Sequence, residues 1–349
     1  MLAAETKRAR AEANSPNANP NGSWKKIVEH IAPFLQTVNE RLSQQVNDFD
    51  PQIVPYAQYA LNGNGKHLRP ALVALSADAA GKAGDAHVTA AVIIEMVHLA
   101  TLVHDDVMDE AEIRRGSPTL AANWGNEIAV LFGDCLFAQA LKLAASFPTP
   151  EVCRAVAMAT NTVCTGEILQ TQHRRNFELS RREYFRVIEM KTAELFTLSC
   201  DLAAFLGGAK PKQRAALREF GAAFGTAYQV YDDCVDLFGT ESEAGKSLGT
   251  DLAKGKLTWP VLLAWERANA GDKAQLESLI QNWLPGNFSA VNELLAKYGT
   301  FEPSLAVAEK YLGQARQALR ILPESDGRAG LLQLADFLAQ QIETLAVCV

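Results

Sequence analysis

The chain has little of what marks secreted, membrane-spanning or nucleic-acid-binding proteins. Its 6 cysteines form no CxxC pair, which argues against a disulfide scaffold and favours reduced thiols in a cytoplasmic protein. No 18 uncharged apolar residues follow one another, so we expect no stable membrane insertion. The 33 Lys and Arg residues against 40 Asp and Glu give a net charge of −7. Such a chain has no overall attraction to nucleic acid.

Several common active-site patterns are also missing. The sequence contains neither a GxGxxG fingerprint nor a GxxxxGK[ST] phosphate loop, and no Ser/His/Asp or Cys/His arrangement stands out. With 48% hydrophobic residues in 349, the chain is long enough to bury a large core. No Ser/Gly/Pro-rich linker divides it after Trp24. We expect a disordered tail over residues 1–23 and one domain over residues 24–349.

Alternating strand-like runs are nearly absent, whereas long segments rich in Ala, Leu, Glu, Lys and Gln recur between glycines and prolines. This composition predicts an all-α fold, a single-domain helical bundle. The expected helices cover approximately residues 24–46, 69–80, 90–109, 127–146, 151–173, 181–206, 212–238 and 258–268, with more in the C-terminal third.

Two acidic clusters echo each other along the chain, HDDVMDE and YDDCVDLF. In each, two aspartates four residues apart share one helix face about 6 Å apart along the axis. Like charges this close, in apolar surroundings, need a cation nearby. Open pairs of carboxylates suit Mg²⁺ that keeps waters and accepts phosphate oxygens. The candidate metal ligands are Asp105, Asp106 and Asp109 in the first cluster and Asp232, Asp233 and Asp236 in the second.

A solvated acidic helix face would explain either cluster alone, but basic residues follow both. Arg114 and Arg115 come after the first cluster, and Lys246, Lys254 and Lys256 after the second. Carboxylates for metal, with Arg and Lys for phosphate oxygens, are the parts of a diphosphate site. A third basic group, in GNGKHLRP, precedes a predicted helix start, where backbone N–H groups favour an anion. An ordinary turn is the alternative interpretation there.

Taken together, these residues resemble the trans-isoprenyl diphosphate synthases, the polyprenyl synthetase family. The resemblance runs from about Trp24 to the C-terminal helices, and its motifs come in one order along the chain. They are GKHLRP (65–70), EMVHLATLVHDDVMDEAEIRRGSPT (95–119), TGEILQ (165–170), KTAELF (191–196), GTAYQVYDDCVDLFG (225–239) and GKSLGTDLAKGKLTWP (245–260).

The resemblance implies a helical bundle of the isoprenoid synthase type, with the two acidic clusters facing each other across the mouth of a central cavity. About three Mg²⁺ ions would lie between them and hold an allylic diphosphate. The groups completing that grip would be Arg114, Lys191, Lys246 and Lys256. The groups holding isopentenyl diphosphate would be Gly65, Lys66, Arg69, His98 and Arg115.

The activity that the resemblance implies is prenyl transfer: the allylic C–O bond ionises, and the isopentenyl double bond attacks the cation. Thr192 and Gln229 would supply oxygen dipoles to the cation, and the departing diphosphate would remove the proton. The sequence leaves two interpretations of Glu167 and Gln170, an orienting role or plain solvation. We expect His104 to pack rather than to bind metal.

Product length depends on the helix that carries the first cluster. Ala100 and Thr101 lie about one turn below Asp105, and neither is bulky. The resemblance then implies a product of about C20 or longer, as made by a geranylgeranyl or longer-chain synthase. The expected residues of a lower floor are Val97, Phe137, Val156 and Met158.

Two other functions share part of this pattern. A class I terpene cyclase would ionise one substrate and lack the isopentenyl pocket, whereas GKHLRP and the second DDxxD are intact here. A non-catalytic subunit of a heteromeric prenyl synthase commonly loses one acidic motif, and both are present. We therefore expect an active prenyltransferase, and a homodimer as is usual in the family.

Overall fold

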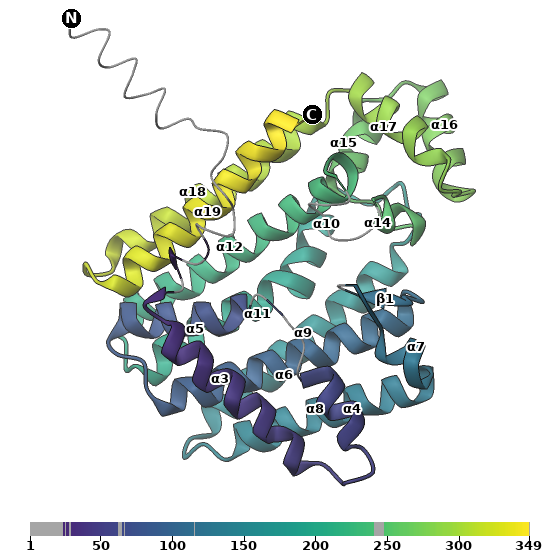
Figure 1. Cartoon of the computed structure of the whole chain (residues 1–349). Helices are drawn as coiled ribbons and strands as arrows, with labels where there is room; N and C mark the ends of the chain where they lie inside the picture. The colour runs from purple at the N-terminus through teal and green to yellow at the C-terminus, as the bar shows by residue number, and fades with distance from the viewer. Residues whose placement is uncertain are drawn as a thin grey trace, which may run out of the picture.

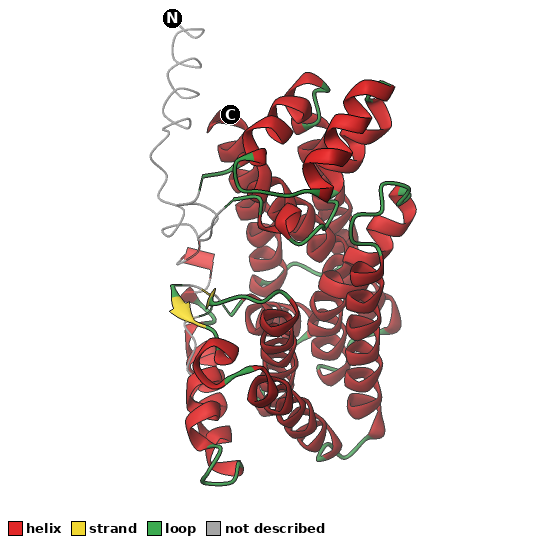
Figure 2. Ribbon diagram, turned by 90° about the vertical axis from the view of Figure 1, so that its right-hand side faces the viewer, coloured by secondary structure: helices red, strands yellow, loops and turns green. Residues whose placement is uncertain are grey.

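The structure is a computed structural model that describes residues 24, 26–27, 29–61, 65, 67–114, 116–240 and 248–348. The predicted tail over residues 1–23 lies outside the described residues. In the described part, helices make up nearly all regular structure, and the strands form one short hairpin (Figure 2). Strands β1 (Ile113–Arg114) and β2 (Ser117–Pro118) pair antiparallel, with Ile113 opposite Pro118. The all-α prediction is confirmed.

Helices of the N-terminal half pack around α6, the helix of the first acidic cluster. Its residues Ile93, Ile94 and Met96 are fully buried, and the helix packs against α8, α5 and α3. Most sides of α6 are apolar, as expected of a helix deep inside a bundle. The elements are α3 (Ala32–Gln45), η1 (Val46–Asp48), α4 (Val54–Leu61), α5 (Leu68–Ala80), α6 (Asp85–Met108), α7 (Leu120–Trp124), α8 (Asn126–Ala145) and α9 (Pro150–Gln172).

The C-terminal half packs around α12, the helix of the second acidic cluster. Figure 1 shows α18 and α19 running alongside α12. Phe196, Phe220 and Phe224 form the aromatic centre of this half. The elements are α10 (Arg181–Ile188), η2 (Glu189–Ala193), α11 (Glu194–Leu206), α12 (Pro211–Phe238), α14 (Thr250–Ala253), α15 (Trp259–Arg267), α16 (Ala270–Gln281), α17 (Asn287–Lys297), α18 (Phe301–Ala318), η3 (Leu319–Ile321) and α19 (Asp326–Cys348).

Two helices join the halves into one body, because each contributes side chains to both cores. On α11, Phe196 belongs to the core around α12, while Leu195 and Leu198 belong to the core around α6. On α5, Leu72 belongs to the core around α12 and Val73 to the core around α6. Neighbouring residues of these helices therefore fix α6 and α12 relative to each other.

The helix predicted over residues 181–206 is interrupted. Residues Glu189–Ala193 form a π-helix, η2, between α10 and α11. Such wide turns are rare in proteins as a whole, but those that occur are often at functional sites. Two glycines let α9 and α12 pack closely against η2. A Cβ on Gly166 of α9 would lie 2.7 Å from the nitrogen of Lys191, and one on Gly225 of α12 would lie 2.7 Å from the Cα of Ala193.

By length and composition, α6 and α8 could each cross a bilayer. In α6, however, 67% of the most apolar window is buried inside the protein, as in a core helix. The corresponding share in α8 is 39%, and its Val130 and Leu131 are exposed. The hydropathy of α6 is thus explained by its place in the bundle.

Candidate active site

The π-helix η2 connects the two acidic clusters, because Lys191 contacts the first directly and the adjacent Thr192 reaches the second through Gln229. The Nζ of Lys191 lies 3.7 Å from Oδ2 of Asp105 on α6. The hydroxyl of Thr192 donates to Oε1 of Gln229 on α12 over 2.8 Å, and Gln229 in turn donates to Asp233 over 2.7 Å. Residues from three distant segments therefore meet as the sequence motifs predict.

Lys191 has three polar partners at the site, Asp105, Glu167 and Gln170. It forms an ion pair with Glu167 and donates to Oε1 of Gln170 over 2.9 Å. Burial alone would lower its pKa, but Asp105 and Glu167 outweigh burial and raise it, so Lys191 stays charged. The two interpretations of Glu167 and Gln170 are thereby decided: both orient Lys191.

The first cluster contains three carboxylates in different environments. Asp105 is four-fifths buried, and burial raises its pKa to about 6 against the opposing charge of Lys191. Burial also raises the pKa of Asp106, whose Oδ1 accepts from Nε of Arg114 over 2.7 Å. Asp106 thus has an internal cation, while Asp105 keeps a longer contact that leaves room for other ligands.

Asp109 ends α6 and is held by two cations. Its Oδ2 accepts from Lys256 over 2.8 Å, and its Oδ1 accepts from Arg174 over 3.0 Å. Burial would raise the pKa of Asp109, but Lys256 and, at longer range, Lys191 and Lys254 hold it below its usual value. Lys256 follows α14, so this contact also brings the segment after the second cluster onto the first.

In the second cluster, only Asp232 lies half-buried, while Asp233 and Asp236 are buried. Asp236 accepts from the hydroxyl of Thr250 over 2.7 Å and from the backbone nitrogens of Thr250 and Asp251. It thereby fixes the start of α14. Asp233 accepts from Tyr184 and Gln229, and burial raises its pKa well above the usual range.

The predicted isopentenyl subsite surrounds a buried acid that the sequence reasoning missed. Glu95, 6% exposed, lies 3.6 Å from Nδ1 of His67. Burial would raise its pKa, but His67, then His98 and Arg69, hold it below the usual value. Arg69 also stacks over the Phe196 ring at 4.8 Å. A signal was present in the sequence, since Glu95 and His98 are three residues apart on one helix face.

Other predicted residues are placed as follows. Lys66, Arg115 and Lys246 lie outside the described residues, and Gly65 is half-buried. His104 packs on α8, with Nε2 3.0 Å from the carbonyl of Val130, as expected. Arg174 and Tyr184 contact the acidic clusters, although no sequence motif pointed to either residue.

The residues predicted to limit product length are buried or half-buried, with one exception that corrects the prediction. Ala100 is fully buried, and Thr101 donates to the carbonyl of His98 over 2.7 Å. Val97 and Val156 are buried in the core around α6. Met158, however, is 64% exposed on α9. It does not line a floor inside this chain, because most of its side chain is exposed to solvent.

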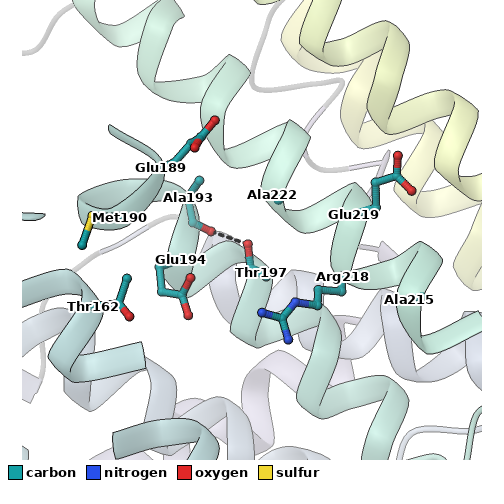
Figure 3. A pocket seen from close by; sticks show the side chains of 10 residues that line it. All are labelled: Thr162, Glu189, Met190, Ala193, Glu194, Thr197, Ala215, Arg218, Glu219 and Ala222. Carbon is teal, nitrogen blue, oxygen red and sulfur yellow. Dashed lines mark hydrogen bonds between the residues drawn. The ribbon is translucent and has the colours of Figure 1, made fainter. Parts of the chain in front are cut away.

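A cleft of about 500 Å³ lies on another surface, where η2 and α11 pass α9 and α12 (Figure 3). Its lining includes Glu189 and Glu194, and burial raises the pKa of both. In Figure 3, Arg218 and Glu219 extend from α12 beside it. None of its lining residues belongs to either acidic cluster, so we do not place a diphosphate there.

The family model for polyprenyl synthetases matches residues 50–296. The chain belongs to the polyprenyl synthetase family. The enzyme is 32% identical over 322 residues to a short chain isoprenyl diphosphate synthase of Methanothermobacter thermautotrophicus, covering 90% of this chain and 99% of the relative. It is 37% identical over 322 residues to heptaprenyl diphosphate synthase component 2 of Bacillus subtilis, covering 91% of each.

Among solved structures, the enzyme is similar to polyprenyl synthase from Caulobacter crescentus, which is complexed with calcium and isoprenyl diphosphate. The TM-score is 0.82 at 32% identity, covering 91% of this chain and 96% of that one. The prediction of a trans-isoprenyl diphosphate synthase is confirmed. The enzyme is a prenyltransferase that elongates isoprenyl diphosphates.

Proposed function

We propose that Asp105, Asp109 and Asp232 hold about three Mg²⁺ ions, which bind the diphosphate of the allylic substrate. The observation that carries this proposal is a pair of contacts made by η2. Lys191 contacts the first cluster, and Thr192 contacts Gln229, three residues before Asp232 of the second. They support a common site for both clusters. Asp233 and Asp236 are buried and hydrogen-bonded to Tyr184 and Thr250, and Asp106 is buried beside Arg114, so we assign these three aspartates to holding neighbouring side chains.

The donor set fits such ions. Within the described residues, no three His, Cys, Asp or Glu side chains converge into a closed cage. Open carboxylates beside cations suit Mg²⁺ that takes its remaining ligands from water and phosphate. When bound, Mg²⁺ neutralises the diphosphate and makes it a better leaving group. The calcium and isoprenyl diphosphate named for the Caulobacter structure support the same donor chemistry.

The protein's own cations complete the allylic subsite. Lys191, Lys256 and Arg114 stand beside the first cluster, each already in contact with one of its carboxylates. They favour the negative charge that develops on the diphosphate as the allylic C–O bond breaks. Glu167 and Gln170 keep Lys191 in place during this step.

Isopentenyl diphosphate would bind at Arg69 and His98, which Glu95 keeps close together. The bonding electrons of the allylic C–O bond leave with the diphosphate. The isopentenyl double bond then forms the new C–C bond, and the departing diphosphate takes the proton lost from the resulting cation. The oxygens of Thr192 and Gln229 stabilise the allyl cation. No side-chain base is required.

We also propose a product of about C20 or longer, a homodimer and a cytoplasmic location. The small side chains of Ala100 and Thr101 support the long product. Exposed Leu131 on α8 and Met158 on α9 support association with a second copy. Five cysteines of the described chain are free thiols, which supports a reducing compartment.

The test is an assay of the purified full chain with Mg²⁺, labelled isopentenyl diphosphate and each allylic primer, followed by chromatography of the dephosphorylated products. We expect condensation, and a loss of more than a hundredfold in turnover for both Asp105→Ala and Asp232→Ala. Near-normal rates in either variant would contradict the metal assignment. Consumption of the allylic substrate alone would indicate a cyclase, and inactivity without a partner chain a non-catalytic subunit.

A further inference from the structure

A buried chain of hydrogen bonds runs from α10 to the oxygens proposed to face the allyl cation. The Tyr184 hydroxyl donates to Oδ2 of Asp233, whose Oδ1 accepts from Nε2 of Gln229 over 2.7 Å. Oε1 of Gln229 accepts from the Thr192 hydroxyl over 2.8 Å. We call these four residues the Tyr184 relay. Each of the three hydrogen bonds has one donor and one acceptor.

The relay begins at a rigid point. Tyr184 is 4% exposed, and its ring packs against Phe185 at 5.0 Å and Trp259 at 6.1 Å. Arg181 lies over the Trp259 ring at 4.6 Å. The Tyr184 hydroxyl therefore has a fixed place, set by α10 and α15, from which it can orient the Asp233 carboxylate.

Asp233 differs from the other aspartates of the clusters in its surroundings. It is 3% exposed, and its two carboxylate oxygens both have partners inside the protein. Asp232, one residue earlier, is half-buried. A carboxylate enclosed in this way is better suited to hold a neighbouring side chain than to reach an ion at the mouth of the site.

The amide of Gln229 can adopt two orientations that differ only by exchange of its oxygen and nitrogen. Asp233 selects one of them, because the carboxylate oxygen accepts from the amide nitrogen. The amide oxygen then lies on the side of Thr192. The reverse orientation would present N–H groups, whose positive end disfavours a neighbouring cation.

We propose that Tyr184 and Asp233 are positioning residues that fix Gln229 with its carbonyl oxygen toward the allyl cation, and that Asp233 is not a metal ligand. This inference rests on the proposed function, since it concerns the same cation. It extends the site by a hydroxyl on α10, outside the acidic and lysine motifs. It also assigns different roles to the adjacent Asp232 and Asp233.

The first experiment compares Tyr184→Phe with Tyr311→Phe in steady-state kinetics of the full chain. Tyr311 is the matched control, because its ring packs on the same Phe185 at 5.8 Å. For Tyr184→Phe we expect kcat to fall about tenfold while both KM values stay within twofold. A fluorinated allylic substrate, whose cation is less stable, should be slowed more in this variant than in wild type. Wild-type kcat and wild-type sensitivity to fluorine in Tyr184→Phe would overturn the proposal.

The second experiment separates positioning from metal binding without measuring turnover. The thermal shift produced by Mg²⁺ with inorganic pyrophosphate is measured for wild type, Asp233→Asn and Asp232→Asn. We expect the wild-type shift in Asp233→Asn and a reduced shift in Asp232→Asn. A loss in Asp233→Asn equal to that in Asp232→Asn would make Asp233 a metal ligand and overturn the inference. If wild type itself fails to condense the substrates, the proposed function fails, independently of these shifts.

Discussion

Among single residues, Asp105 of the first acidic cluster lowers the stability of the folded protein at neutral pH, because its charged carboxylate is largely buried. Asp105 lies beside Lys191 in a largely buried position, and burial raises its pKa to about 6. The folded protein therefore holds the Asp105 proton more tightly than the unfolded chain does. The stability that this provides is fully present below the ordinary pKa of 3.8 and is lost as the pH rises through about 6.

The Asp105→Asn variant should consequently be more stable than wild type at pH 7.5, by roughly 2–3 kcal/mol, and equally stable near pH 4. The reason is that asparagine has no charge to desolvate, while Lys191 keeps its ion pair with Glu167. Urea unfolding in EDTA at several pH values measures the difference. A variant less stable than wild type at pH 7.5 would show that the pair with Lys191 outweighs burial.

The buried Glu95 should affect the binding of isopentenyl diphosphate and not that of the allylic substrate. Replacing it by glutamine removes the charge that holds His67, Arg69 and His98 together. We expect Glu95→Gln to raise the KM for isopentenyl diphosphate about tenfold, corresponding to roughly 1.4 kcal/mol, and to leave the allylic KM unchanged. Steady-state kinetics in each substrate decides. Glu151→Gln is the control, since Glu151 pairs only loosely with Arg154, at 3.9 Å; equal changes in both KM values would contradict the assignment.

At the scale of elements, the close approach of α9 to η2 sets the position of Lys191. A Cβ on Gly166 would lie 2.7 Å from the Lys191 nitrogen and 2.9 Å from the Met190 Cβ. Backbone cannot yield as a flexible side chain does, so the π-helix itself would have to move. The contact thus couples packing between two helices to the geometry of the site.

We expect Gly166→Ala to destabilise the protein by about 1–3 kcal/mol and to lower kcat at least tenfold, because η2 is displaced. The matched control is Gly313→Ala on α18, where an added Cβ meets nothing within 4 Å. That change should be neutral or stabilise by up to about 1 kcal/mol through helix propensity. Urea unfolding and kinetics on both variants measure this, and wild-type behaviour of Gly166→Ala would show that η2 is free to adjust.

At the scale of the whole molecule, product length depends on the space along α6 below the acidic clusters. Ala100 is fully buried one turn from Asp105. Ala100→Phe should place a ring there and shift the products to shorter chains. Chromatography measures the ratio of short to long products, and this ratio tests the prediction even if overpacking reduces the amount of folded enzyme. An unchanged distribution would place the limit to chain growth elsewhere.

The proposed homodimer is also a whole-molecule property. Leu131 is 62% exposed in the single chain, on a helix whose most apolar window is only 39% buried. We expect wild type to elute with the mass of two chains in light scattering, and Leu131→Asp to shift toward one. Asn126→Asp, at the exposed start of the same helix, is the control for an added negative charge. A wild-type monomer would contradict the proposal.

The fold class and most of the candidate site residues could be predicted from the sequence. Helical periodicity and composition were sufficient for an all-α bundle, since those patterns reflect local geometry. The aspartates at i and i+4 indicated a cation for the same reason: neighbours on one helix face are fixed by the helix. The lysines after the second cluster were predicted to bind phosphate oxygens, because a diphosphate site needs cations as well as metal-binding carboxylates.

The partners of each aspartate, in contrast, depend on how the helices pack. Asp106, Asp233 and Asp236 look like their neighbours in the sequence, but Arg114, Tyr184 and Thr250 come to them from other segments. The π-helix could not be predicted either, because it depends on Gly166 and Gly225 of the flanking helices. Spacing along the chain specifies a helix face, whereas burial and hydrogen-bond partners depend on which helices pack against that face.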